Sequence, residues 1–93
     1  MIMTVKIKPE SVNDFLGAMK GALPETRAYE GCVKAEVYSP EDEPSKIMFF
    51  EVWEKKEDHE KYFNWRVESG MMEQMGPILD GQPETVWLTL HDI

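Results

Sequence analysis

Four short stretches of this chain alternate apolar and polar residues, which is the pattern of β-strands with one buried face. They cover residues 1–7, 32–38, 46–54 and 84–91. The stretch 46–54 differs from the others because both of its faces are largely apolar. It therefore predicts a central strand that is covered on both sides.

Two longer stretches repeat apolar residues every three or four positions, which predicts amphipathic helices. The first helix begins at Pro9, because proline's missing N–H costs nothing in a first helical turn, and Pro24 should end or kink it. The second begins at Glu57 and Asp58, whose charges favour the positive end of a helix dipole, and ends near residues 69–70. A short apolar helix follows, containing Met71, Met72, Met75, Ile78 and Leu79.

The resulting order is β-α-β-β-α-(α)-β, with no internal linker or repeat. Its simplest closure is the ferredoxin-like βαββαβ arrangement of the α+β class, a four-stranded antiparallel sheet with the helices on one face. We expect residues 1–93 to form a single domain of this kind. Because one helix layer covers only one face of strand 46–54, a partner subunit is the simplest cover for the other face.

Charge and composition remove several classes of function. The net charge of −8 excludes nucleic acids and anionic membranes as partners, because a surface this acidic repels phosphate groups. No apolar run in the sequence approaches the length of roughly 20 residues that a membrane helix needs. The one cysteine, Cys32, allows no internal disulfide and fits a small core residue in a reducing compartment. These features predict a cytoplasmic protein.

The second helix carries polar groups on the face that should point inward. At about 100° per residue, His59, Tyr62, Phe63 and Arg66 fall within one stripe, with Trp65 at its edge. Buried polar groups need partners. Either Arg66 bonds Glu51 or a helix-end carbonyl while Tyr62 simply packs, or these side chains reach a pocket that holds a ligand. The pattern leaves both interpretations open, and His59 near the helix start is also compatible with plain surface.

Glu51 and Trp53 project from the same face of the predicted central strand. A carboxylate in such apolar surroundings should be paired or protonated. One interpretation is an ion pair with Arg27 or Arg66 that shapes a pocket, and the other is a salt bridge at a subunit interface. The methionines 71, 72 and 75 either fill a core or line an adaptable pocket for flat apolar ligands.

Several kinds of site have no motif in this chain. There are two histidines and no pair of histidine or cysteine residues at ligand spacing, so we expect no metal site. There is no glycine-rich phosphate loop and no nucleophile motif, so we expect neither a nucleotide nor a flavin cofactor.

Three motifs resemble the antibiotic biosynthesis monooxygenase family over nearly the whole chain: Arg27-x-x-x-Gly31-Cys32, Glu51-x-Trp53-Glu54 and His59-x-x-Tyr62-x-x-Trp65-Arg66. The resemblance implies the ferredoxin-like fold and a homodimeric α+β barrel in which two open sheet faces pack together. It also implies oxidation of an aromatic quinol or polyphenol with O2 and without a cofactor. A dry aromatic slot, a group that takes the phenolic proton and room for O2 would serve this chemistry.

The resemblance also suggests roles for individual residues. We expect catalytic roles for His59, Arg66 and Tyr62, with His59 or Arg66 holding the phenolate. The substrate-binding residues predicted alongside them are Trp53, Trp65, Phe63, Glu51 and Met72.

Some positions depart from the family pattern. Many quinol-oxidising relatives carry a histidine nine residues after the Glu-x-Trp tryptophan, where this chain has Tyr62. The first strand lacks the asparagine of the haem-degrading branch, which argues against haem degradation. The alternatives to a monooxygenase are a non-catalytic or stress-related dimeric module that binds a small ligand, and an isomerase on the same fold.

Overall fold

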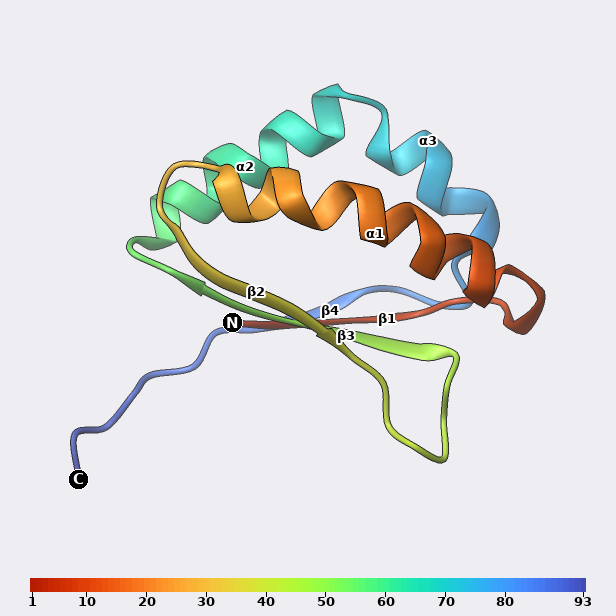
Figure 1. The fold of residues 1–93 in the computed structure, drawn as a ribbon, viewed down its shortest axis with the longest axis horizontal. Coiled ribbons are helices and arrows are strands. Elements are labelled where there is room, and N and C mark those ends of the chain that lie inside the picture. The colour runs from red at the N-terminus through yellow and green to blue at the C-terminus, as the bar shows by residue number, and fades with distance from the viewer.

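A computed structural model, which describes residues 1–93, places the helices on one face of a four-stranded antiparallel sheet (Figure 1). The strands are β1 (Ile2–Lys6), β2 (Cys32–Tyr38), β3 (Lys46–Trp53) and β4 (Glu84–Val86), in the order β2-β3-β1-β4. The helices are η1 (Pro9–Ser11), α1 (Val12–Ala28), α2 (Lys56–Glu68), α3 (Met71–Met75) and η2 (Gly76–Ile78). This is the predicted ferredoxin-like α+β fold, and β3 is a central strand as its two apolar faces indicated.

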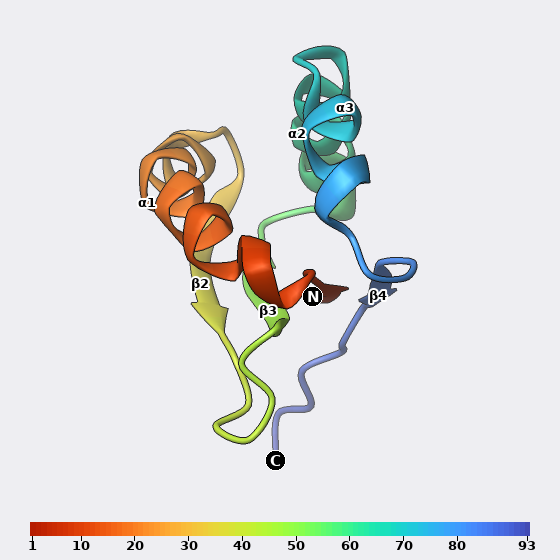
Figure 2. The ribbon, with the colours of Figure 1, turned by 90° about the vertical axis from the view of Figure 1, so that its right-hand side faces the viewer.

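The helices form two groups above the sheet. Viewed from the side, α1 lies over the β2 side, and α2 with α3 lies over the β4 side (Figure 2). The core sits beneath α1, where Val5, Ile7, Phe15 and Ile47 are buried and Phe49 packs edge-on against Phe15. None of the helices combines the length and the apolarity that crossing a bilayer requires.

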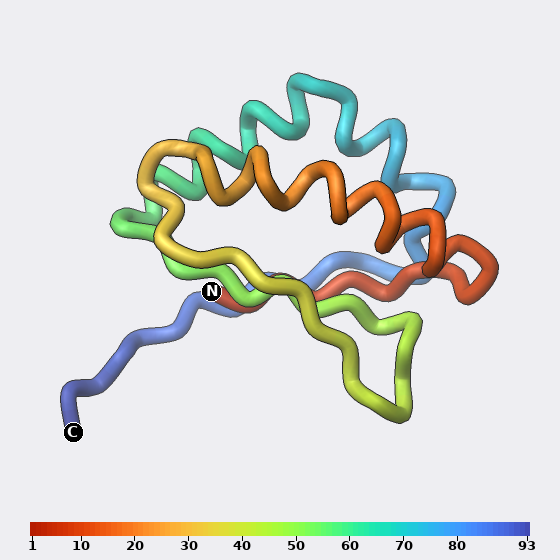
Figure 3. The backbone as a smooth tube through the Cα atoms, viewed as in Figure 1, coloured from red at the N-terminus to blue at the C-terminus, as the bar shows by residue number.

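No element of the chain covers the opposite face of the sheet (Figures 1 and 3). The strand register sets Ile2 between Phe50 and Val86 on this face. Val86 is 53 % exposed and Val52, also on this side, is 37 % exposed. The apolar side chains that predicted a covered face therefore remain open in the single chain.

The last strand is shorter than the pattern predicts, and this corrects the expected range 84–91. β4 ends at Val86, which lies opposite Ile2. The pairing with β1 stops at Val86, and residues 87–91 belong to no strand. The segment 87–93 leaves the sheet as an extended tail (Figure 3).

α1 continues through Pro24 to Ala28, so the proline does not end the helix and a further turn follows it. Thr26, the buried residue beyond the proline, then lies on the inner side of the same helix. Gly31 follows in the left-handed conformation, with φ of 87°. A β-carbon at Gly31 would collide with the Asp58 side chain, so only glycine allows the start of α2 to approach the start of β2 this closely.

Candidate functional site

A cavity of about 330 Å³ lies between the helices and the sheet. The inward stripe of α2 reaches it as the helical spacing predicts, because His59, Tyr62, Phe63 and Arg66 all line its wall. Glu51 from β3 and Met72 from α3 line it too. Most of the remaining wall is hydrophobic. The volume lies near the lower end of the range for small-molecule sites.

His59 is buried on this wall and leaves one polar atom without a partner. The residue is 8 % exposed, and its Nε2 atom makes no hydrogen bond. Burial lowers the pKa of His59 from its ordinary 6.5, which favours the uncharged imidazole. When the ring proton is on Nδ1, Nε2 is an acceptor. A ligand hydroxyl would supply the donor that the protein does not.

Glu51 lies beside His59, with 4.0 Å between its Oε1 and His59 Nε2. Its Oε1 accepts a hydrogen bond of 2.9 Å from Trp53 Nε1. Burial raises the pKa of Glu51 and outweighs the Trp53 hydrogen bond and the charge of the chain's amino group, which lower it. The pKa of the Glu51 carboxyl and the pKa of the His59 imidazole therefore shift towards each other.

The structure corrects the expected ion pair of Glu51 with Arg27 or Arg66. Arg27 Nε donates to the backbone carbonyl of Ala35 at 3.0 Å, and Arg66 faces α1. A salt bridge at an interface on the open sheet face is also excluded, because Glu51 is 5 % exposed and lies on the helix side. The buried carboxyl is instead held by Trp53.

Replacing Glu51 with glutamine should stabilise the protein increasingly as pH rises above 4.5, the ordinary carboxyl pKa. Because the folded-state pKa of Glu51 is raised, the unfolded carboxyl loses its proton first, and the native state loses stability until its own carboxyl ionises. Glutamine keeps an oxygen for the Trp53 hydrogen bond and carries no charge. The difference in melting temperature between Glu51→Gln and the wild type, measured from about pH 4 to pH 8, should grow with pH and then level off.

The control for this comparison is Glu41→Gln, which removes a charge from the exposed loop between β2 and β3. It isolates the effect of burial from the effect of net charge. A difference between Glu51→Gln and the wild type that stays constant with pH would contradict a raised carboxyl pKa at position 51.

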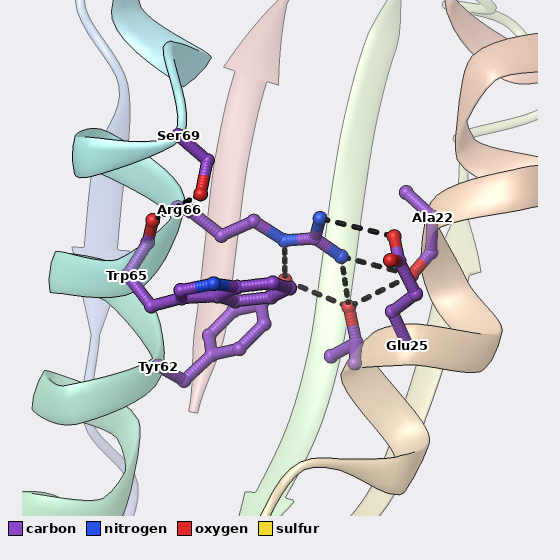
Figure 4. A network of polar contacts seen from close by, with 7 residues as sticks. Ala22, Glu25, Tyr62, Trp65, Arg66 and Ser69 are labelled. Atoms are coloured by element: carbon purple, nitrogen blue, oxygen red, sulfur yellow. Dashed lines mark hydrogen bonds and ion pairs between the residues drawn. The ribbon is translucent and has the colours of Figure 1, made fainter.

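Arg66 makes four polar contacts, three of which join α2 to α1 (Figure 4). Its Nε donates to the Tyr62 hydroxyl at 2.9 Å, and its Nη2 donates to the Ala22 carbonyl at 2.9 Å and to Thr26 Oγ1 at 3.3 Å. Its Nη1 lies 3.3 Å from Glu25 Oε1. The Tyr62 and Thr26 hydroxyls are themselves 2.7 Å apart. The guanidinium is therefore largely occupied by protein partners.

The two predicted tryptophans stand behind the cavity wall and do not line it. The ring centroids of Trp53 and Tyr62 are 5.3 Å apart, and Trp65 stacks on Tyr29 at 5.6 Å. The Arg66 guanidinium lies 4.6 Å from the Trp65 ring centroid, on the side seen in Figure 4. These contacts hold Tyr62 and Arg66 in place, so the two tryptophans support the wall from outside.

Three residues at or beside the site were not predicted from the sequence: Thr26, Tyr29 and Trp87. Thr26 is 2 % exposed. The sequence indicates its position only through spacing, because Thr26 lies four positions after Ala22 and therefore on the same apolar stripe of α1. Tyr29 had no local signal. Trp87 lies in the tail, where its ring packs edge-on against His59 with centroids 5.3 Å apart and lies 5.1 Å from Lys56 Nζ. Trp87 thus covers an edge of the imidazole.

The fold and the site together define a small ferredoxin-like protein with a cavity that is polar in part and otherwise apolar. A sequence profile described as antibiotic biosynthesis monooxygenase matches residues 1–66. The chain belongs to this family.

Solved structures share the fold at low sequence identity. An antibiotic biosynthesis monooxygenase superposes with a TM-score of 0.85 and 16 % identity, covering 97 % of this chain and 95 % of the other. A conserved protein from Methanosarcina mazei Go1 superposes with a TM-score of 0.79 and 23 % identity, covering 89 % of this chain and 82 % of the other. Rv0793 from Mycobacterium tuberculosis superposes with a TM-score of 0.75 and 20 % identity, covering 98 % of this chain and 93 % of the other. At these identities the likeness establishes the fold alone.

A curated relative, the uncharacterized protein sll1783 of Synechocystis, is 29 % identical over 52 residues. The match covers 56 % of this chain and 35 % of the relative, so the aligned part spans about a third of the relative's length.

Proposed function

We propose that this protein is a cofactor-independent monooxygenase that oxidises an aromatic quinol or polyphenol with O2. The observation that carries the proposal is the buried and unpartnered Nε2 atom of His59 on the wall of a largely apolar cavity. An uncharged imidazole in such a site is a suitable acceptor for a phenolic proton. Membership of the family supports the same class of reaction.

The reaction starts when the bound phenol transfers its proton to His59. The phenolate gives one electron to O2, and recombination of the resulting radicals forms a carbon–oxygen bond at a ring carbon that bears hydrogen. The peroxide anion formed in this way takes the proton back from His59. Loss of water, which includes the hydrogen of that ring carbon, then leaves a quinone that contains one atom of the O2, while the other atom leaves in the water. The substrate supplies all the electrons. The apolar walls favour this sequence because they keep water away from the reactive anion.

The proposed catalytic residues differ in what they do for the phenolate. Glu51, when ionised, stabilises the imidazolium that forms on His59 from 4.0 Å away. The Tyr62 oxygen, held by Arg66 at 2.9 Å, marks the position of the substrate's second polar group. Phe63 and Met72 contact the ring of the substrate from the cavity wall, in accordance with their place in the lining. Trp53 and Trp65 act through Tyr62.

The direct test is O2 uptake by purified, metal-stripped protein with a panel of hydroquinones, corrected for spontaneous oxidation. We expect saturable uptake and a quinone that carries one ¹⁸O atom when the gas is ¹⁸O2. Ligand binding without uptake across the panel would overturn the proposal in favour of a non-catalytic binding module. Conversion of a ligand to an isomer without uptake would favour an isomerase.

We further propose that two copies form a homodimer through their open sheet faces. Ile2, Phe50 and Val86 form an apolar row across this face, and no element of the chain covers it. The tail adjoins the edge strand β4 and carries Leu90 and Ile93, whose side chains are fully exposed. An exposed apolar area of this kind marks an interaction surface, and a second copy offers a matching apolar face.

Replacing Phe50 with aspartate should convert the dimer to a monomer that remains folded, because the charge enters the proposed interface and not the core of the single chain. Light scattering coupled to size-exclusion chromatography measures the mass. The matched control is Leu16→Asp, an apolar residue of α1 that is 39 % exposed on the helix side and should stay dimeric. A wild-type protein of monomer mass, or a Phe50→Asp variant of dimer mass, would contradict this interface.

A further inference from the structure

The cavity changes in polarity along its length. At the end near the start of β1, Glu51, His59 and Thr26 contribute polar groups. Towards the start of α1 the lining becomes largely apolar, with Val5, Phe15, Met19, Met75 and Leu79, and Gln74 is the polar residue beside Met75. These five apolar residues belong to, or pack against, the buried core cluster. The two ends are thus chemically distinct.

The order of residues along the elements fixes the distance between these ends. On β3 the polar residue Glu51 and the core residue Ile47 are four positions apart, which is about 13 Å in a strand. On α1, Thr26 and Phe15 are eleven positions apart, which is roughly 16 Å in a helix. Both distances run towards the same end of the cavity, because Ile47 pairs with Val5 and both belong to the core cluster that contains Phe15. The cavity is therefore long enough to hold a ring and a substituent in line.

The volume of the cavity also indicates room for a ring and a substituent. A cavity of about 150 Å³ holds one benzene molecule. The present cavity of about 330 Å³ is roughly twice as large, so a single hydroquinone ring leaves about half of it empty. Methionine is well suited to surround a flexible chain, because its side chain adapts to irregular shapes. No cationic side chain lines the apolar end.

We infer that the site selects an uncharged amphiphilic phenol, whose hydroxylated ring lies against Glu51 and His59 and whose alkyl tail runs between α1 and α3 towards Phe15 and Met75. This inference rests on the proposed function for the orientation of the ring, and it adds a substrate class defined by the tail. A charged tail is disfavoured because Gln74, the polar residue beside Met75, carries no charge that would pair with it.

Binding of 4-alkylphenols with tails of zero to eight carbons tests this inference by isothermal titration calorimetry. These monophenols resist oxidation more than hydroquinones do, and anaerobic titration removes turnover altogether. Each added methylene should tighten binding about three- to fourfold until the tail fills the apolar end. A tail that ends in a carboxylate should lose this gain. Equal affinities for all tail lengths would overturn the inference.

Two variants separate the two ends of the cavity. Met75→Gln places a polar side chain of similar size at the apolar end, so it should flatten the dependence on tail length while leaving unsubstituted phenol unaffected. His59→Gln should weaken every phenol by a similar factor and keep the dependence on tail length. Leu16→Gln, outside the cavity, is the control for a polar substitution on a helix. Equal losses for short and long tails in Met75→Gln would also overturn the inference.

The outcomes distinguish the two proposals. A clear dependence on tail length without O2 uptake by hydroquinones would support the amphiphilic site and overturn the monooxygenase. O2 uptake with no dependence on tail length would support the monooxygenase and overturn the amphiphilic site.

Discussion

Replacing His59 with glutamine should lower kcat by a factor of roughly 10² to 10⁴, the usual contribution of a positioned proton acceptor. Glutamine retains a polar side chain of moderate size, but it cannot accept a full proton near neutral pH. The loss should appear in kcat and in kcat/KM, because proton removal stabilises the transition state. Steady-state O2 uptake with the best hydroquinone of the panel measures both constants.

The pH profile gives a second readout that a structural role would not change. Because burial lowers the pKa of His59, the base form of the wild-type protein persists below pH 6.5, and activity should fall only when the pH passes below that lowered pKa. His59→Gln should lose this acidic limb. His91→Gln, the same substitution at the other histidine in the exposed tail, should keep both the limb and the rate. A His59→Gln variant that retains the wild-type rate would show that another group takes the proton.

Replacing Arg66 with alanine should lower the free energy of unfolding by about 2 to 3 kcal/mol, the range for losing charge-assisted hydrogen bonds in a mostly buried site. The Arg66 side chain is 16 % exposed, and its contacts with Ala22 and Thr26 fasten α2 to α1. Chemical denaturation measures the change. Arg66→Lys should recover only part of it, because an ammonium group does not reproduce the planar fork of donors.

Lys61→Ala is the matched control, since it removes a cation from the exposed face of the same helix. It should change the free energy of unfolding by less than about 0.5 kcal/mol. Measuring kcat of Arg66→Ala at a temperature where the variant stays folded separates the two roles of the guanidinium. A normal stability with a large loss of kcat would make Arg66 chiefly catalytic. A large loss of stability with a normal kcat would make it chiefly structural.

The order of strands and helices was predictable because each element has a local periodicity of apolar residues in the sequence. Apolar periodicity placed the first three strands and the two main helices, and it put His59, Tyr62 and Arg66 on one helix face. The two apolar faces of β3 correctly indicated a central strand. The end of β4 was not predictable, since it depends on pairing with β1, which is distant in the sequence.

The partners of the polar side chains were decided by the tertiary structure. Arg66 and Thr26 lie 40 positions apart in the chain, and no periodicity within α2 indicates that they meet. The sequence required a partner or protonation for Glu51, but only the packing gave it Trp53 and a neighbouring His59 in place of an arginine. Trp87 reaches His59 through the register of β4, which the tail residues do not encode locally. Periodicity determines which face of an element turns inward, whereas the assembly of distant elements decides which groups meet there and which atom is left for a ligand.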